Sequence, residues 1–194
     1  LKRFFDLEGD PDAGASEDLE NQTFNVKVEL ARALGHYATV VYNLDLDLAV
    51  QGDELRRVNL TGQLGGARTM SATTNTLPEG RVISYAANDI GAVLRFIGIY
   101  PRLVGGEGSL VMRYDPPARI DRGEFIIRDF SIADEANLAQ IVGEHRESQQ
   151  VLGRSSSLAF DLGRAEFLRT ADRIEVLEAA LYGDSVGGTM RGNI

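Results

Sequence analysis

The chain has 194 residues, of which 29 are acidic and 20 are basic, so its formal net charge is −9. It has no cysteine and only two histidines, His36 and His145, which excludes a thiolate nucleophile and argues against a zinc site. The acidic balance argues against nucleic acid as a partner, because phosphate binding needs a concentrated basic face. With no run of about 18 apolar residues, the sequence predicts no transmembrane helix.

Residues 1–23 are expected to form an acidic, flexible lead-in. The first 20 residues hold seven acidic and two basic side chains, together with Gly9, Pro11 and Gly14. Such a composition buries too little apolar surface to order the backbone. The chain begins at Leu1 without an apolar leader segment and stops at Ile194 within a strand-like run. We therefore expect it to be a section of a longer protein.

Residues 24–87 alternate between apolar and polar side chains, which predicts a β-meander. The clearest run has apolar residues at five successive even positions and mostly polar residues between them: Tyr42, Leu44, Leu46, Leu48 and Val50. A helix would scatter these positions around its circumference. Turn signals separate the runs, and the expected strands of the whole chain are 24–32, 40–50, 54–64, 67–74, 80–87, 104–115, 119–132, 156–169, 172–182 and 186–194.

Two segments have the spacing of short amphipathic helices instead. In 89–98, Asp89 can cap the first turn and Gly98 can end the helix, and the apolar positions are Ile90, Val93, Leu94 and Ile97. In 135–150 the same spacing recurs, with Asp134 as the cap, at Leu138, Ile141, Val142 and His145. The expected fold is mainly β, with long antiparallel strands and two short helices lying on the sheet.

No motif predicts catalysis, a cofactor or a metal site. The Gly-rich stretch 105–108 is followed by strand residues rather than by a helix, so it is expected to be a tight turn and not a phosphate loop. Asp45 and Asp47 share the polar face of a regular strand, where solvation explains them. Because neither histidine lies in a recognisable constellation, the protein is expected not to be an enzyme.

The apolar faces of the strands leave two alternatives. They either pack against a second layer, as in any β-sandwich, or form a concave wall that lines a channel for acyl chains. Burial of a lipid tail contributes about 0.8 kcal/mol per CH₂ group, so an apolar wall is sufficient to hold lipid. The candidate lipid-contacting residues are Tyr42, Leu44, Leu46, Leu48, Val50, Val58, Leu60, Leu64, Leu110, Met112 and Tyr114.

From residue 88 onward the sequence resembles the AsmA-like C-terminal region of large Gram-negative envelope proteins of the YhdP/TamB type. The resemblance depends on a succession of short motifs rather than on any single one. They are Asn-Asp-Ile-Gly-Ala-Val-Leu-Arg at 88–95, Val-Gly-Gly-Glu-Gly-Ser-Leu at 104–110, Arg-Gly-Glu-Phe at 122–125, Phe-Ser-Ile at 130–132, Leu-Ala-Gln-Ile-Val at 138–142, Phe-Asp at 160–161, Tyr-Gly-Asp at 182–184 and Gly-Gly-Thr-Met-Arg-Gly-Asn-Ile at 187–194.

This resemblance implies a strongly curved, taco-like β-groove, with residues 88–194 continuing the sheet of 24–87. It implies a periplasmic body whose parent protein is anchored in the inner membrane through parts outside this chain. The implied partners are phospholipid acyl chains and other envelope proteins, without nucleic acid. The alternative is a structural β module for envelope assembly that has a closed core and binds partners through an exposed strand edge, without lipid.

Overall fold

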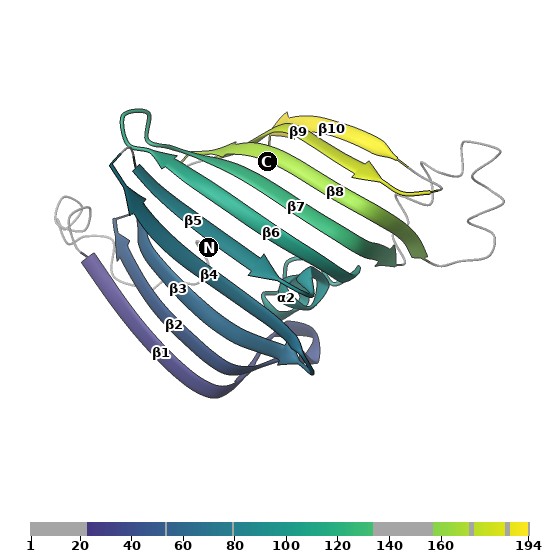
Figure 1. Ribbon diagram of the computed structural model, residues 1–194, viewed down its shortest axis with the longest axis horizontal. Helices are drawn as coiled ribbons and strands as arrows, with labels where there is room; N and C mark the ends of the chain where they lie inside the picture. The colour runs from purple at the N-terminus through teal and green to yellow at the C-terminus, as the bar shows by residue number, and fades with distance from the viewer. Residues whose placement is uncertain are drawn as a thin grey trace, which may run out of the picture.

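A computed structural model describes residues 23–52, 54–78, 80–133, 157–170, 173–184 and 187–193. These residues form one antiparallel sheet of ten strands, and the order of the strands in the sheet is their order in the chain (Figure 1). The strands are β1 (Thr23–Leu34), β2 (Val40–Gln51), β3 (Glu54–Gly65), β4 (Arg68–Leu77), β5 (Gly80–Ala87), β6 (Leu103–Asp115), β7 (Ile120–Ala133), β8 (Ser157–Arg169), β9 (Ile174–Tyr182) and β10 (Gly188–Asn193).

This architecture confirms the mainly β, antiparallel fold that the alternation predicts. The ten strands lie close to the ten predicted ranges, because each run has the period of two that gives a strand one apolar and one polar face. The sheet continues without a break across residue 88, since β5 pairs with β6 along its length. It is not closed: β1 and β10 are the outermost strands and do not pair with each other.

One α-helix, α2 (Ile90–Phe96), connects β5 to β6, where the first of the two helices was predicted. The Asp89 carboxylate accepts a hydrogen bond from the Ala92 N–H at 2.7 Å, which caps the first turn. Gly98 has a φ of +77° just beyond the last turn, a conformation that glycine adopts without steric cost. The predicted helix 135–150 and residues 1–22 of the predicted lead-in 1–23 lie outside the described residues, whereas Thr23 begins β1.

Left-handed backbone conformations interrupt several strands near the α2 end of the sheet. Asn43 in β2, Gly105 and Gly106 in β6, and Asp129 in β7 all have positive φ angles. Gly106 and Asp129 lie at the same level, between the register pairs Gly105–Phe130 and Glu107–Arg128. The expectation of a tight turn at 105–108 is therefore wrong, because these glycines lie inside a strand and change its direction there.

The buried core gathers at the end of the sheet on which α2 lies. Ile90 and Ala92 of the helix join a cluster of buried side chains from seven strands, β2 to β8, namely Val41, Leu64, Met70, Ala87, Leu103, Ile127, Phe130, Leu158 and Phe160. The rings of Phe130 and Phe160 stack there with a centroid separation of 5.2 Å. Close packing is possible because Gly108 carries no side chain: a Cβ atom there would lie 2.6 Å from Ile90. The core thus seals one end of the sheet.

Candidate functional site

One face of the sheet carries mostly apolar side chains, and we call it the apolar face. The register places Leu46 beside Val28 of β1 and Leu60 of β3, and it continues from Leu60 to Ala72 of β4. Farther along the sheet the same face holds rows such as Ile83, Met112 and Gly123, and Tyr85, Leu110, Phe125, Ala165 and Ala179. The apolar face therefore crosses nine of the ten strands, from β1 to β9.

The opposite face carries the polar side chains, and we call it the polar face. Its ion pairs join neighbouring strands, for example Arg57 of β3 with Asp47 of β2 at 2.9 Å and Arg164 of β8 with Glu124 of β7 at 3.6 Å. These groups are largely exposed to solvent, where such pairs contribute little to stability. Asp45 and Asp47 lie on this face, where the sequence places them.

Ten of the eleven candidate lipid-contacting residues share the apolar face: Leu44, Leu46, Leu48, Val50, Val58, Leu60, Leu64, Leu110, Met112 and Tyr114. Leu64 belongs to the buried core near α2, whereas the other nine are only partly buried. Along β2, Leu44 packs against the core, and Leu46 and Leu48 are partly buried as well. The apolar face is thus buried where α2 lies on it and more accessible to solvent along the rest of the strands.

Tyr42 is the exception, because the chain changes direction at Asn43. Val41 and Leu44 are the two β2 residues that face Gly62, where a Cβ atom would lie 2.9 and 3.6 Å from their side chains. Tyr42 lies opposite Gln63 instead and is 42% exposed. The positive φ of Asn43 breaks the alternation, so Tyr42 leaves the apolar face and the fully buried Val41 takes that position.

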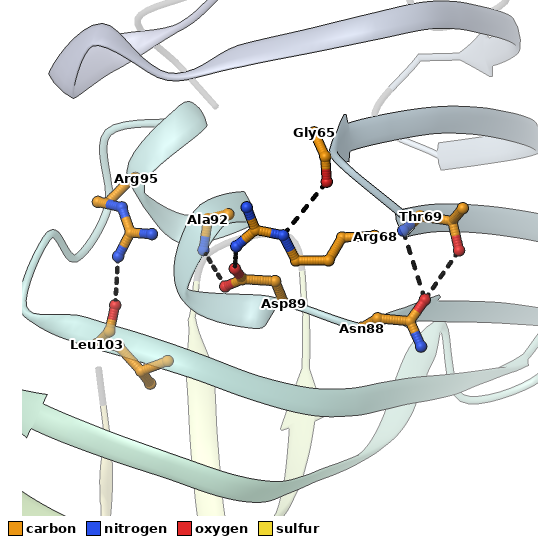
Figure 2. A network of polar contacts seen from close by, with 8 residues as sticks. All are labelled: Gly65, Arg68, Thr69, Asn88, Asp89, Ala92, Arg95 and Leu103. Carbon is orange, nitrogen blue, oxygen red and sulfur yellow. Dashed lines mark hydrogen bonds and ion pairs between the residues drawn. The ribbon is translucent and has the colours of Figure 1, made fainter.

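Polar contacts fasten α2 to the sheet (Figure 2). Asp89 is 3% exposed, and its carboxylate accepts the hydrogen bond from the Ala92 N–H. The same carboxylate forms an ion pair with Arg68 at 2.5 Å. Arg68 begins β4 and its Nε also donates to the Gly65 carbonyl at 3.3 Å, so the β3–β4 turn is tied to the start of the helix. At the other end of α2, the Arg95 guanidinium donates to the Leu103 carbonyl at 2.7 Å. The helix is thereby fixed at both ends.

The end of the apolar face that lies farthest from α2 is polar. One register row there contains Arg81 of β5, Tyr114 of β6, Asp121 of β7 and Arg169 of β8. Asp121 and Arg169 form an ion pair at 3.0 Å, and the Arg81 guanidinium lies 4.6 Å from the centre of the Tyr114 ring. We call these four residues the polar row. Arg81 is 7% exposed, and its Nε has no hydrogen-bond partner among the described residues.

Tyr85 is a second isolated polar group on the apolar face. Its hydroxyl is buried and has no hydrogen-bond partner among the described residues. Burial raises the pKa of Tyr85 above that of a solvated tyrosine, because the phenolate would lose its hydration. Tyr85 therefore remains neutral at physiological pH and presents an unpaired hydroxyl to the face.

The sequence predictions missed several residues of this face. Arg81 and Tyr85 share an alternating run with Ile83 and Ala87, and this run was a detectable signal. The contributions of β7 had no such signal, because Phe125, Ile126 and Ile127 are consecutive apolar residues. Only the register shows that Phe125 and Ile127 lie on the apolar face, whereas Ile126 lies on the polar face.

In the described part of the chain, no group of three or more histidine, aspartate or glutamate side chains is arranged to hold a metal ion. The described helices are too short or too polar to cross a bilayer. Comparisons of the chain with models of protein families, with curated proteins and with solved structures give no match. What the chain does is therefore inferred from its residues, its register and its burial.

Proposed function

We propose that this chain holds the acyl chains of phospholipids on its apolar face, without catalysis, as a section of a larger periplasmic protein that conducts lipid between the inner and outer membranes. The observation that carries this proposal is the continuity of the apolar face across strands β1 to β9. The resemblance to AsmA-like envelope proteins supports the same function, and it supplies the periplasmic location and the inner-membrane anchor of the parent protein.

The energetics favour lipids with two chains. Ten buried methylene groups contribute about 8 kcal/mol of transfer free energy. Association itself costs about 4–15 kcal/mol in lost translational and rotational freedom. A single short chain would therefore bind weakly, whereas two long chains exceed the cost. The partly buried side chains of β2, β3 and β6 provide an apolar surface of this kind, and head groups would remain at a polar boundary.

A curved sheet would bring the two sides of the apolar face closer around such chains. The left-handed residues Asn43, Gly106 and Asp129 support curvature near α2, because bulges bend strands and increase their twist. In this arrangement α2 would close one end of the groove. The lipid would then occupy the part of the face between α2 and the polar row.

The outermost position of β1 among the described strands supports a second candidate function, a module that binds other envelope proteins. Phe24, Val26 and Leu30 of this outermost strand are 54%, 41% and 42% exposed. An exposed apolar edge strand is a template for pairing with a strand of another protein. This candidate requires no lipid, so lipid binding distinguishes the two functions.

The test is native mass spectrometry of the purified chain after incubation with phospholipid, followed by organic extraction of what remains bound. The lipid-holding function predicts phospholipid at a defined stoichiometry. The variant Leu46→Asp, which places a charge in the middle of the apolar face, should lose most of this occupancy. Thr73→Asp, on the polar face of β4, is the matched control and should retain it.

Circular dichroism separates loss of binding from loss of fold in these variants. If Leu46→Asp unfolds the chain while Thr73→Asp does not, Leu46 belongs to a closed core and the groove is refuted. A chain that stays folded and free of phospholipid at all lipid concentrations would favour the edge-binding module instead.

A further inference from the structure

We propose that the polar row is a binding site for the phosphate of an anionic phospholipid head group, with Arg81 as its principal contact. This inference rests on the proposed lipid-holding function and specifies which part of the lipid lies where. The acyl chains would extend from the polar row along the apolar face toward α2.

The charge balance of the polar row favours an anion. Arg169 and Asp121 neutralise each other through their ion pair, so Arg81 leaves the row with one uncompensated positive charge. Arg81 takes part in none of the ion pairs between described residues, although its side chain is more than nine-tenths buried. A guanidinium does not deprotonate in a protein, and its burial without an anion is unfavourable.

The contacts of Arg81 hold its charge in place without satisfying it. The Tyr114 ring, 4.6 Å away, packs on the guanidinium by a cation–π contact, which orients the group but accepts no conventional hydrogen bond. The buried Nε donor is left over. The planar fork of arginine suits bidentate contact with a phosphate, whose oxygens would accept hydrogen bonds from the guanidinium.

The polarity of the face along the strands matches that of a phospholipid. From Arg81 the apolar face continues along β5 through Ile83 and Tyr85 to Ala87, which packs near α2. At about 3.3 Å per residue, this path is about 20 Å long. One leaflet of a bilayer has a hydrocarbon thickness of about 15 Å. An acyl chain anchored by its phosphate at Arg81 therefore fits between the polar row and α2.

The test compares ligands that differ in one part each, using the whole chain and native mass spectrometry or calorimetry. The ligands are dioctanoyl phosphatidylglycerol, dioctanoylglycerol with the same tails but no phosphate, and glycerol phosphate without tails. The expected result is that phosphatidylglycerol binds about 10- to 100-fold more tightly than dioctanoylglycerol, the range of a charged hydrogen bond. Glycerol phosphate should bind far more weakly than either lipid.

Three variants assign the preference to Arg81. Arg81→Gln should abolish the preference for phosphatidylglycerol and leave the binding of dioctanoylglycerol unchanged, whereas Arg81→Lys should retain part of it. Arg113→Gln is the matched control, since Arg113 is the neighbour of Tyr114 on the polar face, and it should bind as the wild-type chain does. Because Arg81→Gln removes an unpaired buried charge, its melting temperature should not fall.

The outcomes distinguish failure of the head-group site from failure of the proposed lipid-holding function. If the wild-type chain binds both lipids equally, or if Arg81→Gln keeps the preference, the head-group site is refuted and lipid holding stands. If glycerol phosphate binds as tightly as phosphatidylglycerol, the row is a site for free anions and the inference is wrong. If no lipid binds at all, the proposed function itself fails.

Discussion

At the scale of single residues, Tyr85 shows how an apolar face tolerates a polar group. Its hydroxyl is buried without a hydrogen-bond partner among the described residues. Such a group loses its hydration without compensation, at a cost of about 1–3 kcal/mol. The ring itself belongs to the partly buried side chains around the core. Removing the oxygen alone should therefore relieve the cost and keep the packing.

We predict that Tyr85→Phe increases the free energy of unfolding at pH 7 by about 1 kcal/mol, as measured by urea denaturation. The variant should also change the response to alkali. The pKa of Tyr85 is raised in the folded chain, so above pH 10 the unfolded chain loses this proton first and stability falls, by at most about 1.4 kcal/mol per pH unit. Tyr85→Phe should lack this component. Equal slopes above pH 10 in both chains would show that the hydroxyl is solvated.

The close packing of Phe167 on Gly123 leads to a second prediction at the scale of single residues. A Cβ atom at this position would lie 2.1 Å from the ring of Phe167, which crosses β7 there. We predict that Gly123→Ala lowers the free energy of unfolding by about 1–3 kcal/mol, the cost of overpacking. The double variant Gly123→Ala, Phe167→Leu should recover part of that loss, because the shorter side chain leaves room. If the single variant is as stable as the wild type, Phe167 has another position available.

At the scale of elements, the attachment of α2 depends on Asp89. Replacing it with alanine removes the cap of the helix and the partner of Arg68, which is itself half-exposed and can be solvated. We predict that Asp89→Ala destabilises the chain by about 1–2 kcal/mol, the usual cost of a lost cap. Arg68→Ala should cost at least as much, since it leaves the nearly buried carboxylate of Asp89 without a cation. Thermal unfolding of both variants and of the double variant measures the coupling.

The elements also show how far the sequence leads. Alternation predicts all ten strands, because each strand has one apolar and one polar face. Helical spacing between a capping Asp89 and a terminating Gly98 predicts α2. Alternation misplaces Tyr42, because an asparagine tolerates the left-handed conformation without demanding it, and only the contacts of Val41 with Gly62 reveal the change. It also misses Arg81, whose significance comes from three neighbouring strands that contribute Tyr114, Asp121 and Arg169. Register across strands is not encoded in any local pattern.

At the scale of the whole molecule, a meander of neighbouring hairpins should not be equally stable along its width. The central strands β5 to β8 have two hydrogen-bonded neighbours and contribute most of the buried core. The outer strands have one neighbour each, and every residue of β10 is exposed. Local opening requires little free energy where few apolar contacts hold the backbone. Stability should therefore decline from the centre of the sheet toward both edges.

We predict that backbone amides of β6 and β7 exchange with deuterium more than about tenfold more slowly than those of β10 and of the outward-facing side of β1, equivalent to more than about 1.4 kcal/mol in opening free energy. Hydrogen exchange followed by mass spectrometry of peptides measures this difference. Saturation with phospholipid supplies the control, because ligand bound to the apolar face should slow exchange in the central strands and leave β10 unchanged. Slow exchange throughout β1 in the ligand-free chain would contradict the prediction. It would mean that another strand pairs with this edge in solution, as the edge-binding module requires.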